Sequence, residues 1–283
     1  IPFLKKGQLI ILRSTVYPGT SEWLYNYLYK KKKCHVAFCH ERVIQGYTFD
    51  EIEKLPQIIA ASSIFAERRA ADLFKKISKK IVYCSLKEAE FSKLFSNAYR
   101  YAQFAISNEF YMLADKVGLD FNKIRKVTKD GYPRAESMPS AGFAAGPCLL
   151  KDTMQLLSFS RNNFSMGNSS MLVNEGLVLY LVDKLQSKYR LKSKNVGLLG
   201  MAFKAECDDT RSSLSYKMKK FLSTKVKRLL CTDPFVKTDK SLSSLKKTIK
   251  ESDILILCVP HKNYKKLNLK NKEVIDIWGF INK

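Results

Sequence analysis

The sequence predicts an α/β protein in which two strand-rich regions flank a helical middle region. Short apolar runs bounded by turn residues occupy residues 1–84, apolar residues recur at helical spacing through 85–188, and strands alternate with helices through 189–283. We therefore expect three domains with these boundaries. The last domain is expected to hold a parallel, Rossmann-like sheet.

The first region begins with an apolar run over residues 8–12, followed by a turn at Pro18 and Gly19. Thr20 or Ser21 is expected to cap the helix that follows. The pattern then predicts strands over 36–38, 57–61 and 81–84, and a charged helix over 66–76.

The middle region is predicted to consist of long helices. Apolar spacing predicts one buried helix from Lys87 to about Val117, and a second helical stretch over 152–159 that resumes at 169–188 after a break near 162–168. Long helices between two strand-rich regions are typical of a spacer or a dimer interface. The polar stretch 186–194 is the predicted linker.

The last region predicts a nucleotide-binding sheet, because ligands of parallel sheets bind at the carboxyl ends of the strands. Gly200 follows the first of these strands, so the loop 201–211 occupies the expected nucleotide position. The GxGxxG motif does not occur in the chain. The expected strands are 196–199, 226–231, 254–259 and 274–277, with helices over 213–222 and 242–250.

Composition excludes a disordered or fibrous protein, because 283 residues with 46% hydrophobic and 12% aromatic content can bury a core. The net charge of +24 suggests a polyanionic partner, but only eleven of the fifty basic residues are Arg. Since phosphate and base readers favour the Arg fork, this Lys excess is more typical of a solvated surface. We therefore expect no nucleic-acid partner.

The cysteines and histidines form no metal-ligand spacing, so no metal is expected. A reduced, cytoplasmic protein is the simplest interpretation. The sequence shows no apolar run long enough for a membrane helix, no signal peptide and no initiator Met, so we expect the chain to begin inside a longer protein and to need no membrane. The cysteines and histidines without metal-ligand spacing are Cys34, Cys39, Cys84, Cys148, Cys207, Cys231, Cys258, His35, His40 and His261.

The sharpest local signal is a small-residue loop, Gly142 to Pro147, that leads into a helical pattern. Pro suits a first helical turn, which would place Cys148 where free N–H groups and the helix dipole favour a thiolate, with Asp152 one turn on. Cys148 is therefore a candidate nucleophile. The alternative is that it is a small hydrophobe like most of the other cysteines.

Polar residues on a largely apolar helix face form a second candidate site. Lys93 and Asn97 stand four residues apart and so share a face, where they are costly unless paired or functional. The alternative is that Lys93 reaches solvent and Asn97 caps a neighbouring loop. Thr15 and Glu41 follow predicted strands, where α/β sheets place ligand-binding groups, although both residue types are common in turns and on surfaces.

Taken together, five segments in order resemble the UDP-glucose/GDP-mannose dehydrogenase family. They are Arg13-Ser-Thr-Val-Tyr-Pro-Gly-Thr20, His40-Glu-Arg-Val-Ile-Gln-Gly46, Glu90-Phe-Ser-Lys-Leu-Phe-Ser-Asn97 with Asn108-Glu109, Gly142 to Asp152, and Leu199-Gly-Met-Ala-Phe-Lys204 with Asp208-Asp-Thr-Arg211. The resemblance implies an NAD-binding Rossmann domain, a helical dimerisation domain and a second Rossmann-like domain that binds the nucleotide of a UDP-sugar. It also implies a homodimer.

The resemblance implies oxidation of the sugar C6 alcohol to a carboxylate in two hydride transfers to NAD. Cys148 would capture the aldehyde as a thiohemiacetal that is oxidised to a thioester and hydrolysed. Lys93 would stabilise oxyanions, Asn97 would hold the sugar and the developing charge, and Asp152 would assist water activation or proton transfer.

The remaining family positions concern binding. Thr15 and Glu41 match positions near the cofactor and the catalytic water, and Lys151 and Arg211 match basic residues that contact NAD. The nucleotide part of the substrate would lie against Phe203 and Lys204.

Two departures from the family pattern lead to further expectations. The family opens with a strand, GxGxxG and a helix, and this chain starts after that unit, so we expect the chain as given to bind NAD poorly or not at all. Gln45 falls near a further acid of the UDP-glucose and GDP-mannose enzymes, which favours a UDP-N-acetylhexosamine or another UDP-hexose as substrate. A non-catalytic remnant that binds nucleotide sugar or dimerises remains the alternative.

Overall fold

The computed structural model describes residues 1–283 apart from 45, 47, 270, 282 and 283, so Gln45 lies outside the described residues. Contacts divide the chain into two compact units. Unit 1 comprises 1–97 and 158–162, and unit 2 comprises 98–157 and 163–283. The helix α4 (Leu86–Lys116) contributes residues to both units, as does α6 (Leu149–Phe159).

Unit 1 holds a four-stranded sheet in the order β1-β2-β3-β4. β1 and β2 are parallel, as are β3 and β4, but β2 and β3 run antiparallel. The predicted strands and charged helix are confirmed to within two residues at each end. The elements are β1 (Leu9–Leu12), α1 (Thr20–Lys32), β2 (His35–Phe38), α2 (Thr48–Glu51), β3 (Gln57–Ala61), α3 (Ile64–Phe74) and β4 (Ile81–Tyr83).

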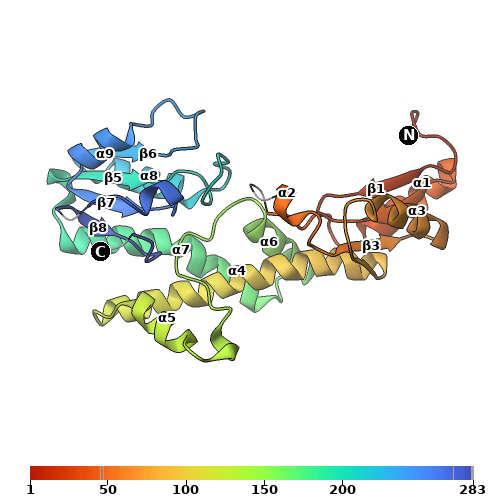
Figure 1. Ribbon diagram of the computed structural model, residues 1–283, viewed down its shortest axis with the longest axis horizontal. Helices are drawn as coiled ribbons and strands as arrows, with labels where there is room; N and C mark the ends of the chain where they lie inside the picture. Colours follow the sequence, from red (N-terminus) through yellow and green to blue (C-terminus); the bar gives the residue numbers. More distant parts are fainter. Residues whose placement is uncertain (45, 47, 270, 282–283) are drawn as a thin grey trace. The chain divides into compact units, whose positions relative to one another are not determined.

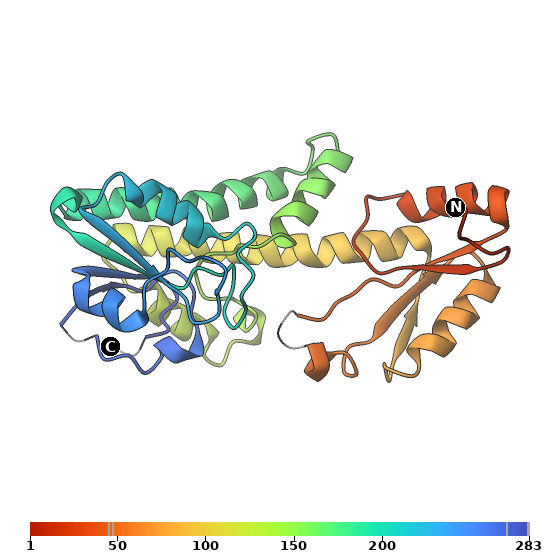
Figure 2. The same ribbon diagram turned by 90° about the horizontal axis from the view of Figure 1, so that it is seen from above.

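Alternating residues of β2 build two apolar layers in unit 1. Val36 packs toward Leu28 of α1, whereas Ala37 packs toward Phe74 of α3. Phe38 meets Ala89 near the start of α4. Because side chains alternate across a strand, the sheet is covered on both faces, and Figure 2 shows the red α1 and the orange α3 on opposite sides of it.

The predicted cap of α1 is wrong. Neither Thr20 nor Ser21 caps the helix, since α1 starts at Thr20 and its cap residue is Gly19, with a φ of 92° and no capping side chain of its own. The carboxylate of Glu90 replaces that cap, accepting hydrogen bonds from the backbone N–H groups of Gly19 at 2.6 Å and Ser21 at 2.7 Å. A helix N-terminus favours an anion, and here the anion is a carboxylate from α4, a helix distant in the sequence.

The long middle helix is confirmed as α4. The second stretch consists of α6 and α7 (Ser165–Lys188), and the expected break at 162–168 is shorter, because α7 already begins at Ser165. Gly167 permits the early start, since a Cβ there would lie 2.5 Å from the ring of Phe164. The amphipathic helix α5 (Phe121–Lys129), capped by Asp120, was not predicted.

The expected linker over 186–194 is partly helical. α7 ends at Lys188, and a short 3-10 turn, Leu191–Ser193, leads directly into the next sheet. The helix continues into this polar stretch because the apolar residues Leu185, just before it, and Leu191, within it, are buried in the core of unit 2.

Unit 2 holds the predicted parallel sheet, in the order β6-β5-β7-β8. The α7 and α8 side chains cover one face through Val196 and Leu198, and α9 covers the other through Leu255 (Figure 1). The elements are β5 (Asn195–Leu199), α8 (Leu214–Ser223), β6 (Arg228–Thr232), α9 (Leu245–Glu251), β7 (Ile254–Leu257) and β8 (Glu273–Ile275).

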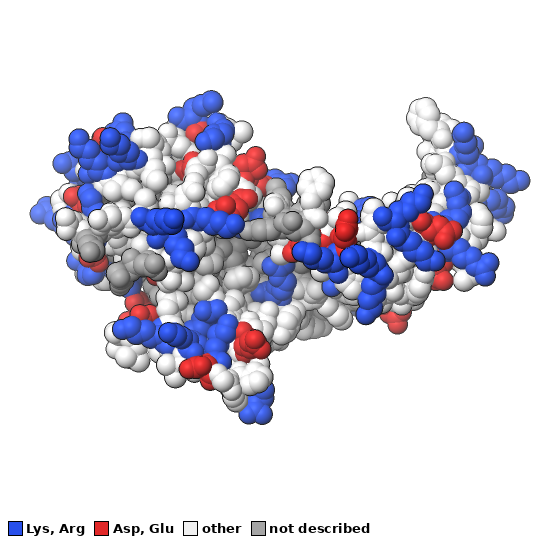
Figure 3. Space-filling model, in the orientation of Figure 1, with Lys and Arg blue, Asp and Glu red and all other residues white. Residues whose placement is uncertain are grey.

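The surface is rich in basic side chains that are spread over many elements. Figure 3 shows Lys and Arg with Asp and Glu between them on the visible face. Several basic residues are paired, such as Lys217 with Glu175 at 2.9 Å and Arg228 with Glu251 at 2.6 Å. In the part of the chain that the structure describes, no helix is long and apolar enough to cross a membrane.

Candidate active site

Cys148 lies directly before α6, and its carbonyl oxygen accepts the backbone N–H of Asp152 at 2.9 Å. The helix begins one residue after the cysteine, so Pro147 precedes the first turn rather than standing within it. All seven cysteines are described, and Cys148 alone is exposed. Its thiol therefore combines access to solvent with the positive end of a helix dipole.

Asp152 and Lys151 lie on the first turn of α6, next to the cysteine. The carboxylate of Asp152 is fully buried, and its Oδ1 lies 3.1 Å from Nζ of Lys151, a side chain that is half exposed. A buried carboxylate needs a charged partner, which Lys151 supplies here. Cys148 and Asp152 are thus one helical turn apart, but the cysteine is exposed whereas the aspartate is fully buried.

Two glycines hold the cysteine loop against aromatic rings of the second sheet region. A Cβ on Gly142 would lie 2.4 Å from the ring of Trp278, and a Cβ on Gly146 would lie 2.4 Å from the ring of Phe203. Both glycines have a positive φ, 155° and 102°, which side chains rarely allow. The N–H of Gly146 also donates to the carbonyl of Ser212 at 3.3 Å.

Two buried asparagines fix the other end of this loop. Asn108 on α4 accepts the N–H of Gly142 at 2.8 Å through Oδ1 and donates through Nδ2 to Oδ1 of Asn174 on α7, also at 2.8 Å. Asn174 in turn donates to the carbonyl of Tyr101 at 3.0 Å. Both amides are fully buried, so this network orients the loop from the long helices.

The predicted nucleotide residues lie on the loop after β5, beside the cysteine loop. Phe203 and Lys204 are half-buried, and Nζ of Lys204 lies 5.9 Å from the ring centroid of Phe203. Arg211 is exposed and pairs with Asp209 at 2.7 Å. The hydrogen bonds to the Asp209 carboxylate raise the pKa of Arg211.

In unit 1 the structure brings Glu41 and Lys93 together, as Nζ of Lys93 donates to the backbone carbonyl of Glu41 at 2.9 Å. The Glu41 carboxylate pairs with Arg13 and accepts the N–H groups of Arg42 and Val43. Burial acts to raise the pKa of Glu41, but the two backbone donors and Arg13 outweigh it and leave the pKa below its usual value. Glu41 is thus held as an anion.

The neighbouring His40 is buried and stays neutral. Burial, followed by the positive charges of Lys93, Arg42 and Arg13, lowers the pKa of His40 to about 4. These cations form a basic environment around Glu41. Asn97 is also buried, one turn beyond Lys93 on α4, and the half-buried Thr15 lies in the turn between β1 and α1.

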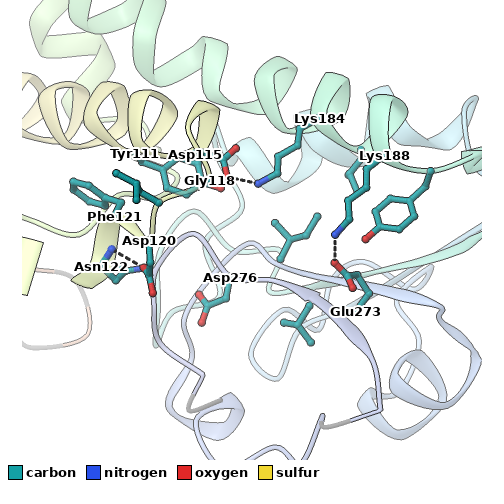
Figure 4. A pocket seen from close by; sticks show the side chains of 15 residues that line it. Tyr111, Asp115, Gly118, Asp120, Phe121, Asn122, Lys184, Lys188, Glu273 and Asp276 are labelled. Atoms are coloured by element: carbon teal, nitrogen blue, oxygen red, sulfur yellow. Dashed lines mark hydrogen bonds and ion pairs between the residues drawn. The ribbon is translucent and has the colours of Figure 1, made fainter. Parts of the chain in front are cut away.

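A separate pocket in unit 2, with a volume of about 310 Å³, is lined by residues other than the predicted ones. Figure 4 shows Lys184 directed toward Asp115 and Lys188 toward Glu273, and both contacts are ion pairs. These two pairs connect α4 with α7 and α7 with β8 along the pocket.

Sequence reasoning did not single out several polar residues that shape these sites. Glu90 and Asn108 stand within the segments quoted above, so the family pattern contained that signal. Arg13, which also donates to the carbonyl of Cys39 and to Gln57, was likewise inside a quoted segment. Asn174 and His261 lie outside every quoted segment, and nothing in their local sequence distinguished them.

Comparisons with known proteins agree with this geometry. Residues 87–175 match the central domain of the UDP-glucose/GDP-mannose dehydrogenase family, and residues 197–283 match its UDP binding domain. The two matches together cover more than half of the chain.

Relatives match the chain along almost its whole length. The UDP-N-acetyl-D-mannosamine dehydrogenase of Methanocaldococcus jannaschii is 27% identical and aligns with 100% of this chain and 68% of its own. The NDP-N-acetyl-D-galactosaminuronic acid dehydrogenase of Ralstonia solanacearum is 24% identical, over 98% of this chain and 71% of its own.

A solved structure of the UDP-D-ManNAc dehydrogenase from Pyrococcus horikoshii superposes with a TM-score of 0.86 at 26% identity, covering 99% of this chain and 68% of that one. The order of the motifs, the fold of both units and the two domain matches agree. This chain therefore belongs to the UDP-glucose/GDP-mannose dehydrogenase family.

Proposed function

We propose that the protein oxidises the C6 alcohol of a UDP-sugar to a carboxylate, with NAD as hydride acceptor and Cys148 as nucleophile. The observation that carries this proposal is the exposed thiol directly before α6, in a loop that packs on Phe203. The relatives named for N-acetylated sugars favour a UDP-N-acetylhexosamine, and a UDP-hexose is the alternative.

The chain's own residues supply distinct roles in this reaction. The Cys148 thiolate adds to the C6 aldehyde carbon to form a thiohemiacetal, and the thioester that follows is hydrolysed by water. Asp152 assists that water or takes its proton. Lys93 stabilises the oxyanions, and Asn97 holds the sugar and its developing charge.

For the cofactor we propose Thr15, Glu41, Lys151 and Arg211 as contacts. The N-terminus of α1 does not fit the cofactor's pyrophosphate, because the Glu90 carboxylate already occupies it.

The nucleotide half of this proposal is tested by binding of UDP to the purified chain. Lys204→Ala is expected to weaken UDP binding about tenfold in calorimetry, because it removes a cation from the loop at the carboxyl end of β5. Lys220→Ala, an exposed lysine on α8, is the matched control. Equal affinities of the wild type and Lys204→Ala would argue against this nucleotide site.

The oxidation half is tested by NADH formation with a panel of UDP-sugars. The alternative function, a remnant that binds nucleotide sugar without oxidising it, is favoured by the N-terminus of α1, which the Glu90 carboxylate already occupies. UDP binding without NADH formation supports the remnant, whereas NADH formation that depends on the UDP-sugar excludes it.

We also propose that the protein is a cytoplasmic homodimer with the domain division 1–84, 85–188 and 189–283. Seven unpaired cysteines are consistent with a reducing compartment. An exposed apolar stripe on α4 supports the dimer. The stripe consists of Tyr99, Ile106, Phe110 and Leu113 on α4 and Val117 directly after it, and it continues on α5 with Ile124 and Val127.

Leu113→Lys is expected to shift the protein from dimer to monomer in sedimentation velocity, because it places a charge in the middle of this stripe. Trp23→Lys in α1 is the control, since Trp23 is similarly exposed, 64% against 55%. A wild-type protein that sediments as a monomer at all concentrations would contradict the proposed dimer.

A further inference from the structure

His261 and Asp233 form a buried pair at the carboxyl edge of the unit 2 sheet. Asp233 follows β6 and His261 follows β7, and Nε2 of His261 lies 3.1 Å from Oδ2 of Asp233. The histidine is fully buried, and the aspartate is 9% exposed. Two polar residues from different strand ends thus meet where a parallel sheet binds its ligands.

The hydrogen bonds around His261 determine its tautomer. Its Nδ1 lies 3.1 Å from the backbone nitrogen of Glu206, and a backbone N–H can only donate, so Nδ1 accepts. Burial acts to raise the pKa of Asp233, but His261 and the N–H groups of Ala202 and Met201 outweigh it and lower that pKa to about 2. The aspartate therefore accepts, and Nε2 of the histidine carries the proton.

Through these bonds the pair holds both ends of one loop segment. Oδ2 of Asp233 accepts the N–H groups of Met201 at 2.6 Å and Ala202 at 3.0 Å, directly before Phe203 and Lys204. His261 accepts the N–H of Glu206, two residues after Lys204. Phe203 and Lys204 therefore lie between two anchors that belong to a single buried pair.

The backbone at Glu206 shows why an anchor is needed there. Glu206 has a φ of 57°, in the left-handed region that side chains seldom adopt. Such a conformation persists only where its surroundings hold it, and the acceptor Nδ1 of His261 supplies one such hold. The N–H of Lys262 adds a second by donating to Oε1 of Glu206 at 2.8 Å.

We propose that His261 is a positioning residue for nucleotide binding, which sets the place of Phe203 and Lys204 through the N–H of Glu206. His261 itself is fully buried and does not touch the nucleotide. The inference rests on the UDP site of the proposed function. It adds a residue outside the motifs that carried that function.

Two conservative variants separate the two hydrogen bonds of the imidazole. In His261→Asn the side-chain oxygen takes the place of Nδ1 and still accepts the Glu206 N–H, whereas in His261→Gln the amide takes the place of Nε2 and still donates to Asp233. Both variants remove the ring, and Gln, with one more methylene group, keeps more of its volume. A role in packing alone would therefore make His261→Asn the more harmful variant, the opposite of the order expected here.

The experiment measures UDP affinity by calorimetry and amide hydrogen exchange at Glu206 by NMR, with Asn and Gln variants compared at the same temperature. We expect about tenfold weaker UDP binding and fast Glu206 exchange in His261→Gln, and both near wild type in His261→Asn. Equal affinities in the two variants, whether weakened or unchanged, would overturn the inference.

The exchange measurement also separates this inference from the proposed function. A wild-type chain that does not bind UDP refutes the nucleotide site itself, and with it the binding role of His261. Exchange of the Glu206 amide needs no ligand, so it decides whether His261 holds the loop even if the wild-type chain does not bind UDP. Slow exchange of Glu206 in His261→Gln would refute the proposal that His261 holds the loop.

Discussion

Replacement of Cys148 by serine is expected to lower uronic acid formation at least about a thousandfold, because a serine hydroxyl does not replace the thiolate that carries the thioester. The UDP affinity is expected to stay within about twofold of wild type, since the cysteine lies before α6 and the nucleotide loop follows β5. Product formation is followed by mass spectrometry and binding by calorimetry.

A second measurement on the same variant needs no turnover. Because Cys148 is the single exposed cysteine, a thiol reagent should modify one residue per native chain and none in Cys148→Ser. Cys84→Ser, at a half-buried cysteine, is the control that should leave both labelling and activity unchanged. Normal acid formation by Cys148→Ser would refute the nucleophile assignment.

Glu90→Ala is expected to destabilise unit 1 by about 3 kcal/mol, because it leaves two N–H groups in the first turn of α1 without their carboxylate partner. The Glu90 side chain is 1% exposed, so solvent cannot easily replace it. Urea unfolding followed by circular dichroism measures the change, and hydrogen exchange of Gly19 and Ser21 locates it.

Glu90→Gln should retain part of this stability, since its amide oxygen still accepts one of the two bonds. Glu109→Gln is the control, because Glu109 is an exposed glutamate on the same helix α4. Unchanged protection of Gly19 and Ser21 in Glu90→Ala would show that the carboxylate does not stabilise the start of α1.

Local patterns predicted most elements of this fold but not how they pair. The strand Gln57–Ala61 was expected with its observed ends, yet its antiparallel pairing with β2 depends on the partner strand and leaves no mark in its own sequence. The cap of α1 failed for the same reason, since Glu90 is 71 residues from Gly19. The short α5 was not predicted because it has only nine residues, four of them basic.

The candidate site was predictable where residue types combine chemistry with an unusual local sequence. Cys148 follows a loop of small residues and precedes a helix, and Lys93 is a cation on an apolar helix face. Both local patterns therefore predicted candidate site residues. His261 did not, because a single histidine after an apolar strand resembles an ordinary core residue. Its partners Asp233 and Glu206 are brought to it only by the folded sheet.

The two glycine contacts of the cysteine loop also bear on the order in which the protein matures. Trp278 and Phe203, the rings against which Gly142 and Gly146 pack, are translated long after Cys148 itself. During synthesis the loop therefore leaves the ribosome before the two aromatic rings against which it packs. The loop that carries Cys148 can therefore reach its packed conformation only after Trp278, which follows the last strand of unit 2, has been made.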